Sequence, residues 1–172
     1  MKIFLIISAW LALVSPLLGA TKTLTVLGDK QIKTQWDGSM PKAMRAKGIE
    51  TNVTGIIISN GQLVPTFGFD ITSKKKPVSV RVEDVTGKEA VLMVEDASPV
   101  IERAHWKGSS SPREITPDGV PWLFTAGDTL TVFRFTVVLE GDKAPVVIYQ
   151  PSVFSESSKS QLLNLAALMK KS

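Results

Sequence analysis

Five residues between positions 96 and 128 offer the side chains best suited to binding: His105, Trp106, Lys107, Arg113 and Trp122. Trp and Arg are enriched at the hot spots of protein interfaces, and functional residues gather on connections that a rigid scaffold holds. This combination predicts a partner-binding surface on the connection. The alternative is that Trp106 and Trp122 fold inward and cover the end of a sheet, as large aromatic side chains commonly do.

Catalysis has less support, because His105 is the only histidine in the chain. A Ser-His-Asp arrangement would need one of the serines at 109–111 together with Asp118. The sequence around these residues lacks the nucleophile-elbow pattern and its strand–turn–helix context. We therefore predict no catalytic residue and a protein that is not an enzyme. A hydrolase that uses His105 remains the last of three alternatives.

Metal and cofactor sites are not predicted either. The chain has no cysteine and a single histidine, whereas transition-metal cages require several ligands of these types. Two pairs of adjacent carboxylates, Glu83-Asp84 and Glu95-Asp96, stand in or beside expected strands. Adjacent side chains on a strand point to opposite faces, so neither pair forms a clamp by itself. No glycine-rich phosphate loop is found in the sequence.

The element expected to hold the 96–128 connection is a hairpin over residues 129–149, with a turn at 140–143. Successive side chains of a strand alternate between its two faces. The apolar face of the first strand comprises Phe133, Phe135, Val137 and Leu139. Arg134 points to the opposite face. If that face is buried, Arg134 requires a carboxylate partner, because a buried charge is costly when unpaired.

Further hairpins are predicted from their turn residues. Asn60-Gly61 separates two β-like segments, and this dipeptide favours a two-residue hairpin loop. Ser59 then opposes Gln62, and Ile58 opposes Leu63. The other predicted strands cover residues 23–27, 31–36, 78–83 and 90–94, with a possible strand at 120–125. Pro151 is expected to end the sheet, since proline lacks a backbone donor.

Short strands with turn signals every 8–12 residues or so predict an all-β fold, an antiparallel β-sandwich over residues 21–155. An immunoglobulin-like Greek key is the favoured form, and a small barrel is the alternative. The resemblance to immunoglobulin-like modules is one of general pattern, because the Cys…Trp…Cys signature is absent. It assigns no functional residue.

Three helical segments are expected. Two are short, one over residues 41–47 that ends at Gly48 and one over residues 100–104. The third is an amphipathic C-terminal helix within residues 156–172, with Ser158 and Gln161 as a capping box. Its apolar face comprises Leu162, Leu165, Ala166 and Met169. This helix docks on its own domain or contacts a partner.

Residues 1–20 have the order of a secretory signal peptide: a charged start, an apolar core and small residues at the exit. The alternative is an uncleaved anchor, and no later segment is long enough to span a bilayer. An exported domain without cysteine indicates the bacterial periplasm or medium. The formal charge is +4, but nucleic acid is not expected as the partner of an exported protein.

Three classes of function follow. The first is an exported binding or adaptor module of the cell envelope that recognises a protein through a sheet edge or the 96–128 connection. The second is a periplasmic protein that binds a small ligand or polysaccharide, with Trp106 or Trp122 as a stacking platform and Lys107 or Arg113 supplying charge. The third is the hydrolase.

Overall fold

The structure is a computed structural model that describes residues 19–60, 62–71, 75–96, 101–102, 105–109 and 113–171. Several side chains within strands also lie outside the description, those of residues 54–57, 59, 64–71, 96, 101–102 and 105–109. The signal segment up to residue 18, and Gly61 of the predicted Asn-Gly turn, lie outside the described residues. Cleavage and export therefore stay predictions.

The first sheet is an N-terminal antiparallel meander of β1 (Ala20–Val26), β2 (Lys30–Asp37) and β3 (Met40–Pro41). The structure confirms the two strands predicted here. Leu27 and Gly28 turn the chain with φ angles of 53° and 83°, a conformation that costs glycine little. The hairpin joins the rest of the protein where the Leu27 N–H donates to the Val85 carbonyl over 3.1 Å.

The second sheet has the order β4-β5-β6-β10-β9, and β11 pairs with β6 further along. Its strands are β4 (Met44–Ala46), β5 (Ile49–Ser59), β6 (Gln62–Ile71), β9 (Ile101–Glu102), β10 (His105–Ser109) and β11 (Arg113–Glu114). The predicted register is confirmed, because Ser59 faces Gln62 and Ile58 faces Leu63.

The predicted helix over residues 41–47 is wrong. Ala46 pairs with Ile49 across a two-residue loop, Lys47-Gly48, whose φ angles are 48° and 76°. Two consecutive positive φ angles are the geometry of a tight hairpin turn. Gly48 thus serves a strand connection instead of ending a helix, and the segment before it is strand β4.

The predicted helical turn over residues 100–104 is wrong where it is described, because Ile101 and Glu102 form β9. The 96–128 connection is also less irregular than its sequence suggests. His105–Ser109 is strand β10, in which Trp106 pairs with Phe69 and Lys107 with Gly68. These partners are distant in sequence, so local periodicity gives no sign of the pairing.

The third sheet has the order β13-β12-β7-β8. Its strands are β7 (Pro77–Asp84), β8 (Val91–Asp96), β12 (Thr129–Leu139) and β13 (Val146–Phe154). The predicted hairpin is confirmed as β12 and β13. Pro151 does not end the sheet: it pairs with Val132, and β13 continues to Phe154. The possible strand at 120–125 is instead a 3₁₀ helix, η1 (Pro121–Phe124).

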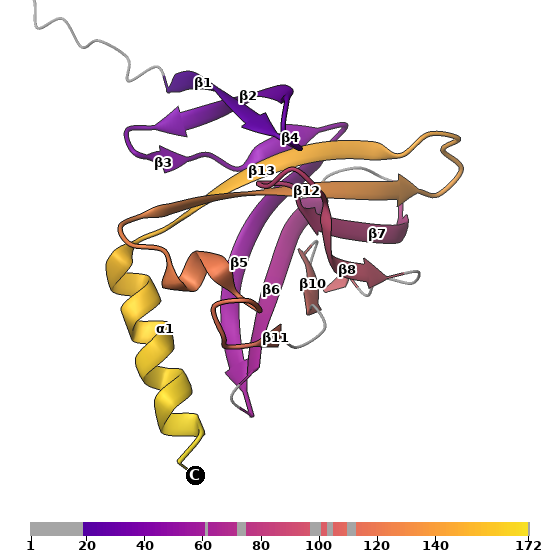
Figure 1. The fold of residues 1–172 in the computed structure, drawn as a ribbon. Helices are drawn as coiled ribbons and strands as arrows, with labels where there is room; N and C mark the ends of the chain where they lie inside the picture. The colour runs from indigo at the N-terminus through magenta and orange to yellow at the C-terminus, as the bar shows by residue number, and fades with distance from the viewer. Residues whose placement is uncertain are drawn as a thin grey trace, which may run out of the picture.

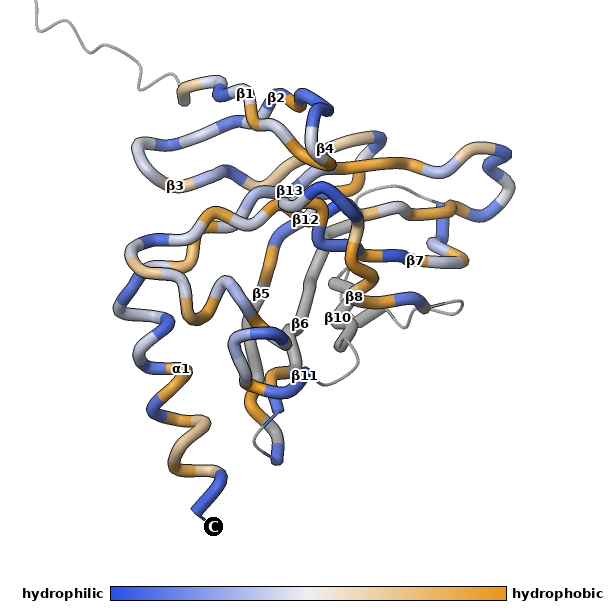
Figure 2. Tube along the Cα trace, viewed as in Figure 1, coloured by the Kyte–Doolittle hydropathy of each residue, from blue (hydrophilic) through white to orange (hydrophobic). Residues whose placement is uncertain are grey.

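The main core lies between the third sheet and the β4–β5 end of the second sheet (Figure 1). Phe135 and Val137 of β12 are fully buried, and Ile49 of β5 packs in the same cluster. Figure 2 shows apolar residues concentrated where these strands meet. The all-β expectation is confirmed as antiparallel sheets with one C-terminal helix. None of the three sheets closes on itself among the described residues, so the small barrel is not found there.

The C-terminal helix is α1 (Glu156–Met169), and the predicted capping box at Ser158 and Gln161 is wrong, because Ser158 lies inside the first turn. Ser155 caps it by accepting from the Ser158 N–H over 3.1 Å. Ala166 is buried, whereas Leu165 and Met169 are 46% and 40% exposed, so only part of the predicted apolar face docks on the domain, and a partner contact through the rest stays a prediction. Within the described residues, no helix is long and apolar enough to cross a membrane.

Lys159 fixes the first turn of α1 to the preceding loop. It is 3% exposed, and its ammonium donates to the carbonyls of Thr125 and Gly127 and, over 3.1 Å, to Thr129 Oγ1. A buried ammonium is costly unless several acceptors bind it. These three oxygens therefore allow a lysine to be buried on the docked face of the helix.

We expect Lys159→Met to lower the free energy of unfolding by about 1 kcal/mol, because hydrogen bonds to a charged donor are lost. Thr125 and Gly127 are exposed, so water compensates their carbonyls in part. Urea denaturation measures this change, with Lys171→Met as the control at an exposed position. Equal stability of the two variants would contradict a tethering role for Lys159.

Candidate functional site

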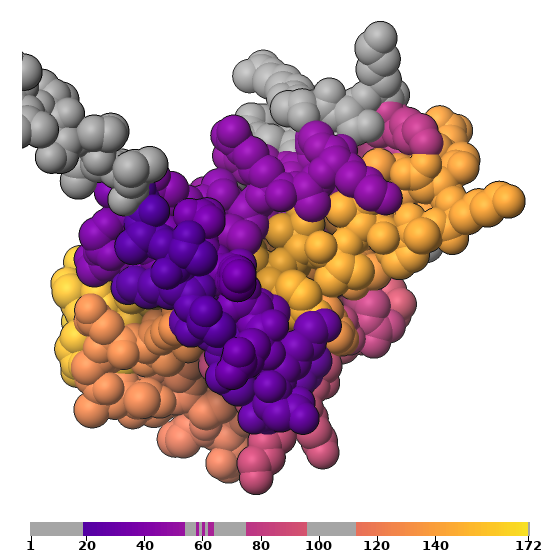
Figure 3. All heavy atoms as spheres, turned by 90° about the horizontal axis from the view of Figure 1, so that it is seen from above, coloured from indigo at the N-terminus to yellow at the C-terminus, as the bar shows by residue number. Residues whose placement is uncertain are grey.

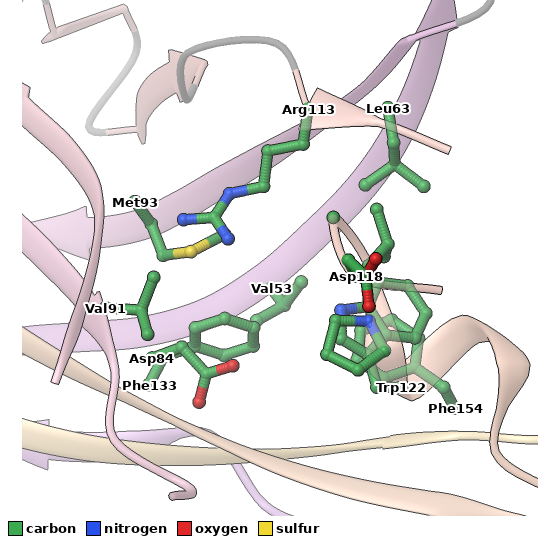
Figure 4. Close-up of a pocket in the computed structure, with 13 residues that line it drawn as sticks. Val53, Leu63, Asp84, Val91, Met93, Arg113, Asp118, Trp122, Phe133 and Phe154 are labelled. Atoms are coloured by element: carbon green, nitrogen blue, oxygen red, sulfur yellow. The ribbon is translucent and has the colours of Figure 1, made fainter. Parts of the chain in front are cut away.

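A cavity of about 260 Å³ lies between the second and third sheets and is closed at one end by η1 (Figure 4). Its wall draws on both layers of strands and on the loop before η1. The lining residues are Val53, Leu63, Asp84, Val91, Met93, Arg113, Asp118, Gly119, Val120, Pro121, Trp122, Phe133 and Phe154. Segments far apart in the sequence therefore meet around one hollow.

A bulge in β8 places an additional apolar residue in the cavity wall. Val82 pairs with Val94, but Glu83 pairs with Leu92, so Met93 is the extra residue of the ladder. A bulge turns two successive side chains away from strict alternation. Accordingly, Met93 and Val94 are both buried, and Met93 contributes a flexible thioether to the wall.

Three charged side chains stand among the apolar ones. Arg113 enters from β11 and donates from Nη2 to the Leu92 carbonyl over 3.0 Å. Asp84 accepts from the Thr86 N–H over 2.9 Å and from Thr86 Oγ1 over 2.6 Å. Figure 4 shows the Arg113 guanidinium reaching toward Met93, with Asp118 on the Trp122 side. A mostly apolar hollow with a few placed polar groups is typical of binding sites.

Trp122 stacks on Phe154, with ring centroids 4.3 Å apart and an angle of 24° between the planes. The contact ties η1 to the end of β13, and the indole is half-buried. Trp122 thus packs inward, as the alternative held, and also lines the cavity. One face of the ring is taken by Phe154.

The structure brings Arg113 and Trp122 together and separates them from the other predicted binding residues. Arg113 faces Leu63 on β6, whereas His105 faces Asp70 on the same strand. At about 3.4 Å per residue the two positions are roughly 24 Å apart. The side chains of His105, Trp106 and Lys107 lie outside the description, so their part in binding stays a prediction.

The outer face of the third sheet carries an ion-pair cluster in which Arg134 has a carboxylate partner. Arg134 pairs with Glu83 across β12 and β7, with Nε and Nη2 at 2.8 and 2.7 Å from Oε2. Arg81 Nε lies 3.1 Å from the other oxygen, Oε1. Glu83 is only 5% exposed, so its charge is compensated from both sides.

These contacts shift the pKa values of the cluster. Burial acts to raise the pKa of Glu83, but hydrogen bonds from Arg134 and Arg81 outweigh it and hold the pKa below the usual 4.5. Burial acts to lower the pKa of Arg134, and the Glu83 carboxylate raises it overall. The pKa of Arg81 is raised chiefly by its hydrogen bond to Glu83. All three groups are therefore charged at neutral pH.

No known protein family matches this chain. No curated protein and no solved structure is similar to it either. Function must therefore be inferred from the chemistry of the two places just described.

Arg113 and Trp122, predicted as binding residues, both line the cavity, whereas the sequence gives no sign of Asp84, Met93 and Phe133 as cavity residues. The sequence marks Asp84 only as the neighbour of Glu83, and the structure places the two on opposite faces of β7, Asp84 in the cavity wall and Glu83 in the ion-pair cluster. Phe133 was expected in the core. No group of three or more His, Cys, Asp or Glu side chains suited to a metal ion occurs among the described residues.

Proposed function

We propose that the chain is an exported, non-enzymatic binding protein of the bacterial cell envelope. It recognises a partner protein by taking one apolar side chain of the partner into the cavity. We also propose that the two larger sheets are the layers of an immunoglobulin-like sandwich, with the cavity at one end between them. Residues 21–155 would form this domain after removal of the signal peptide.

The main support for this proposal is the size of the cavity, which suits one side chain. Small-molecule pockets commonly hold about 300–1,000 Å³, and this cavity, at about 260 Å³, falls just below that range. One aromatic or branched side chain fills such a space. Desolvated pockets of this kind are where partner anchors bind in protein interfaces.

The polar groups of the wall suit a peptide segment around such an anchor. Arg113 is half-buried and Asp118 is exposed, so they offer one cation and one anion near the opening. Val91 and Leu92 add exposed apolar area on strand β8, at 43% and 45%. β8 is the edge of its sheet in the strand order, and edge strands accept partner segments by backbone pairing.

A periplasmic small-ligand carrier is the second candidate, and the apolar lining of the cavity favours it. Its ligand would be a compact apolar molecule with one polar group directed at Arg113. Trp122 offers little for stacking of a sugar, because Phe154 covers one face of its ring.

The variant that tests the proposal is Val91→Trp, which fills the cavity from its exposed edge and leaves the core in place. A photo-crosslinking residue at Leu92, beside the cavity, is expected to trap a protein in the envelope of expressing cells. We expect Val91→Trp to reduce that product about tenfold, the loss of about 1.4 kcal/mol of binding.

Val78→Trp is the matched control, because Val78 is a similarly exposed valine on β7, at 40%, and does not line the cavity. The control should retain the crosslinked product. An undiminished product in Val91→Trp would refute the cavity as the recognition site. Crosslinking to a small molecule alone would replace the protein partner by the second candidate.

A further inference from the structure

A second hollow lies on the outer face of the third sheet, beside the N-terminal hairpin. It is lined by Lys30, Arg81, Glu83, Arg134, Thr136, Val147 and Tyr149. Figure 3 shows the N-terminal strands lying against the β12–β13 hairpin. β7, on the other side of β12, supplies Arg81 and Glu83. The hollow is therefore built by three separate parts of the chain.

The buried carboxylate of Glu83 holds two guanidinium groups in fixed positions. One oxygen contacts Arg81 and the other contacts Arg134 in two places. A guanidinium has five N–H donors, so each arginine retains donors after these contacts. Orientation of a binding group by a second, buried residue is how precise sites are built.

Lys30 completes the cationic lining from the opposite side. Its ammonium donates to the Tyr149 hydroxyl over 2.7 Å and lies 4.9 Å from the centroid of the same ring. Tyr149 faces Arg134 in the β12–β13 register. The ammonium and the Arg134 guanidinium thus flank one tyrosine.

The charge of this hollow is positive. Its lining has three cationic side chains and one carboxylate, which gives a formal charge of +2. Glu95 pairs with Arg81 over 3.1 Å, so the cluster that includes it keeps a net charge of +1. An excess of one sign of charge around a hollow attracts ligands of the other sign.

We propose that this hollow binds a phosphate group. The arginine fork matches phosphate oxygens in bidentate geometry, and the net positive charge of the cluster attracts an anionic phosphate group. Val147, which is 44% exposed, and the Tyr149 ring provide an apolar wall for the group that carries the phosphate. The site is separate from the cavity, because Glu83 and Asp84 point to opposite faces of β7.

Titration of the folded chain with inorganic phosphate and glycerol phosphate, followed by the NMR signals of the arginine side chains, tests the proposal. We expect saturable shifts of Arg81 and Arg134. Lys30→Gln and Arg81→Gln should each weaken binding about tenfold, as expected when a charged hydrogen bond is removed. Arg134 is kept, because its removal would leave Glu83 buried without its main partner.

Lys33→Gln is the control, since Lys33 is an exposed lysine on the same strand as Lys30 and does not line the hollow. If Lys33→Gln and Lys30→Gln weakened phosphate binding equally, the effect would come from net charge alone, and the proposal would be overturned. So would an absence of binding in all titrations. Failure here leaves the Val91→Trp test untouched.

The source of the phosphate is distinguished with vesicles. Phosphatidylglycerol vesicles that bind the chain, in a manner sensitive to Lys30→Gln and Arg81→Gln, would support a lipid headgroup. Binding of glycerol phosphate without vesicle binding would support a soluble phosphate compound. Phosphatidylcholine vesicles serve as the neutral control, and equal binding to both vesicle types would contradict phosphate recognition.

Discussion

Replacing Gln150 by Leu is expected to lower the free energy of unfolding by about 3 kcal/mol, because several buried polar groups lose their partners at once. Gln150 is 1% exposed. Its Oε1 accepts from the Met44 N–H over 2.8 Å and from Thr51 Oγ1 over 3.2 Å. Its Nε2 donates to the carbonyls of Lys42 and Pro151 over 3.2 and 2.8 Å.

The position of these bonds explains the size of the effect. β13 belongs to the third sheet, whereas Met44 and Thr51 belong to the second, so one side-chain amide joins the two layers. Leucine has a similar size but no polar atoms, and a buried unpaired group costs about 1–3 kcal/mol. The expected loss of stability is smaller than the sum of these costs, because Thr51 Oγ1 also donates to the Met44 carbonyl over 3.4 Å.

Urea denaturation followed by circular dichroism measures the loss, with Gln35→Leu as the control. Gln35 is an exposed glutamine whose side-chain amide bonds to the hydroxyl of Thr21. Exposed substitutions usually change stability by less than about 0.5 kcal/mol. Equal stability of Gln150→Leu and Gln35→Leu would mean that the Gln150 amide does not stabilise the contact between the second and third sheets.

The hairpins could be predicted from sequence because their information is local. Alternation in β12 and the Asn60-Gly61 turn each involve neighbouring residues, and the Ser59–Gln62 register follows from the loop length alone. The strand at residues 44–46 could not be predicted, because a segment that starts with Pro41, continues with helix-favouring residues and ends before Gly48 resembles a short helix. The Gln150 amide, about a hundred residues away, satisfies the Met44 backbone as a strand.

In the candidate sites, too, residue type is visible in the sequence, whereas contacts between distant strands are not. Residue type alone selects Arg113 and Trp122, since arginine and tryptophan are enriched in binding surfaces, and both line the cavity. Met93 enters the cavity through a bulge, which no periodicity reveals. The sequence predicts a carboxylate partner for Arg134 if its face of the strand is buried, but only the register of β12 against β7 identifies Glu83.

Replacing Glu83 by Gln is expected to lower the free energy of unfolding at neutral pH by about 2 kcal/mol. Removal of one partner from a buried pair commonly costs about 3–5 kcal/mol, and the partial exposure of Arg134, at 24%, reduces this figure. The glutamine amide has nearly the same shape but cannot neutralise two guanidinium groups. Glu95→Gln is the control: its carboxylate contacts the same Arg81 but is 62% exposed.

The same carboxylate makes stability depend on pH with a definite sign. The pKa of Glu83 is lower in the folded chain than its usual 4.5, so the unfolded chain takes up the proton first. The stabilisation is fully present above the unfolded pKa and is lost as the pH falls through the lower folded value. Denaturation curves from pH 7 downward should therefore show the difference between wild type and Glu83→Gln shrinking below about pH 4.5. A difference that stayed constant over this range would mean that the ionised carboxylate does not stabilise the sheet, and that the two arginines are held by other contacts.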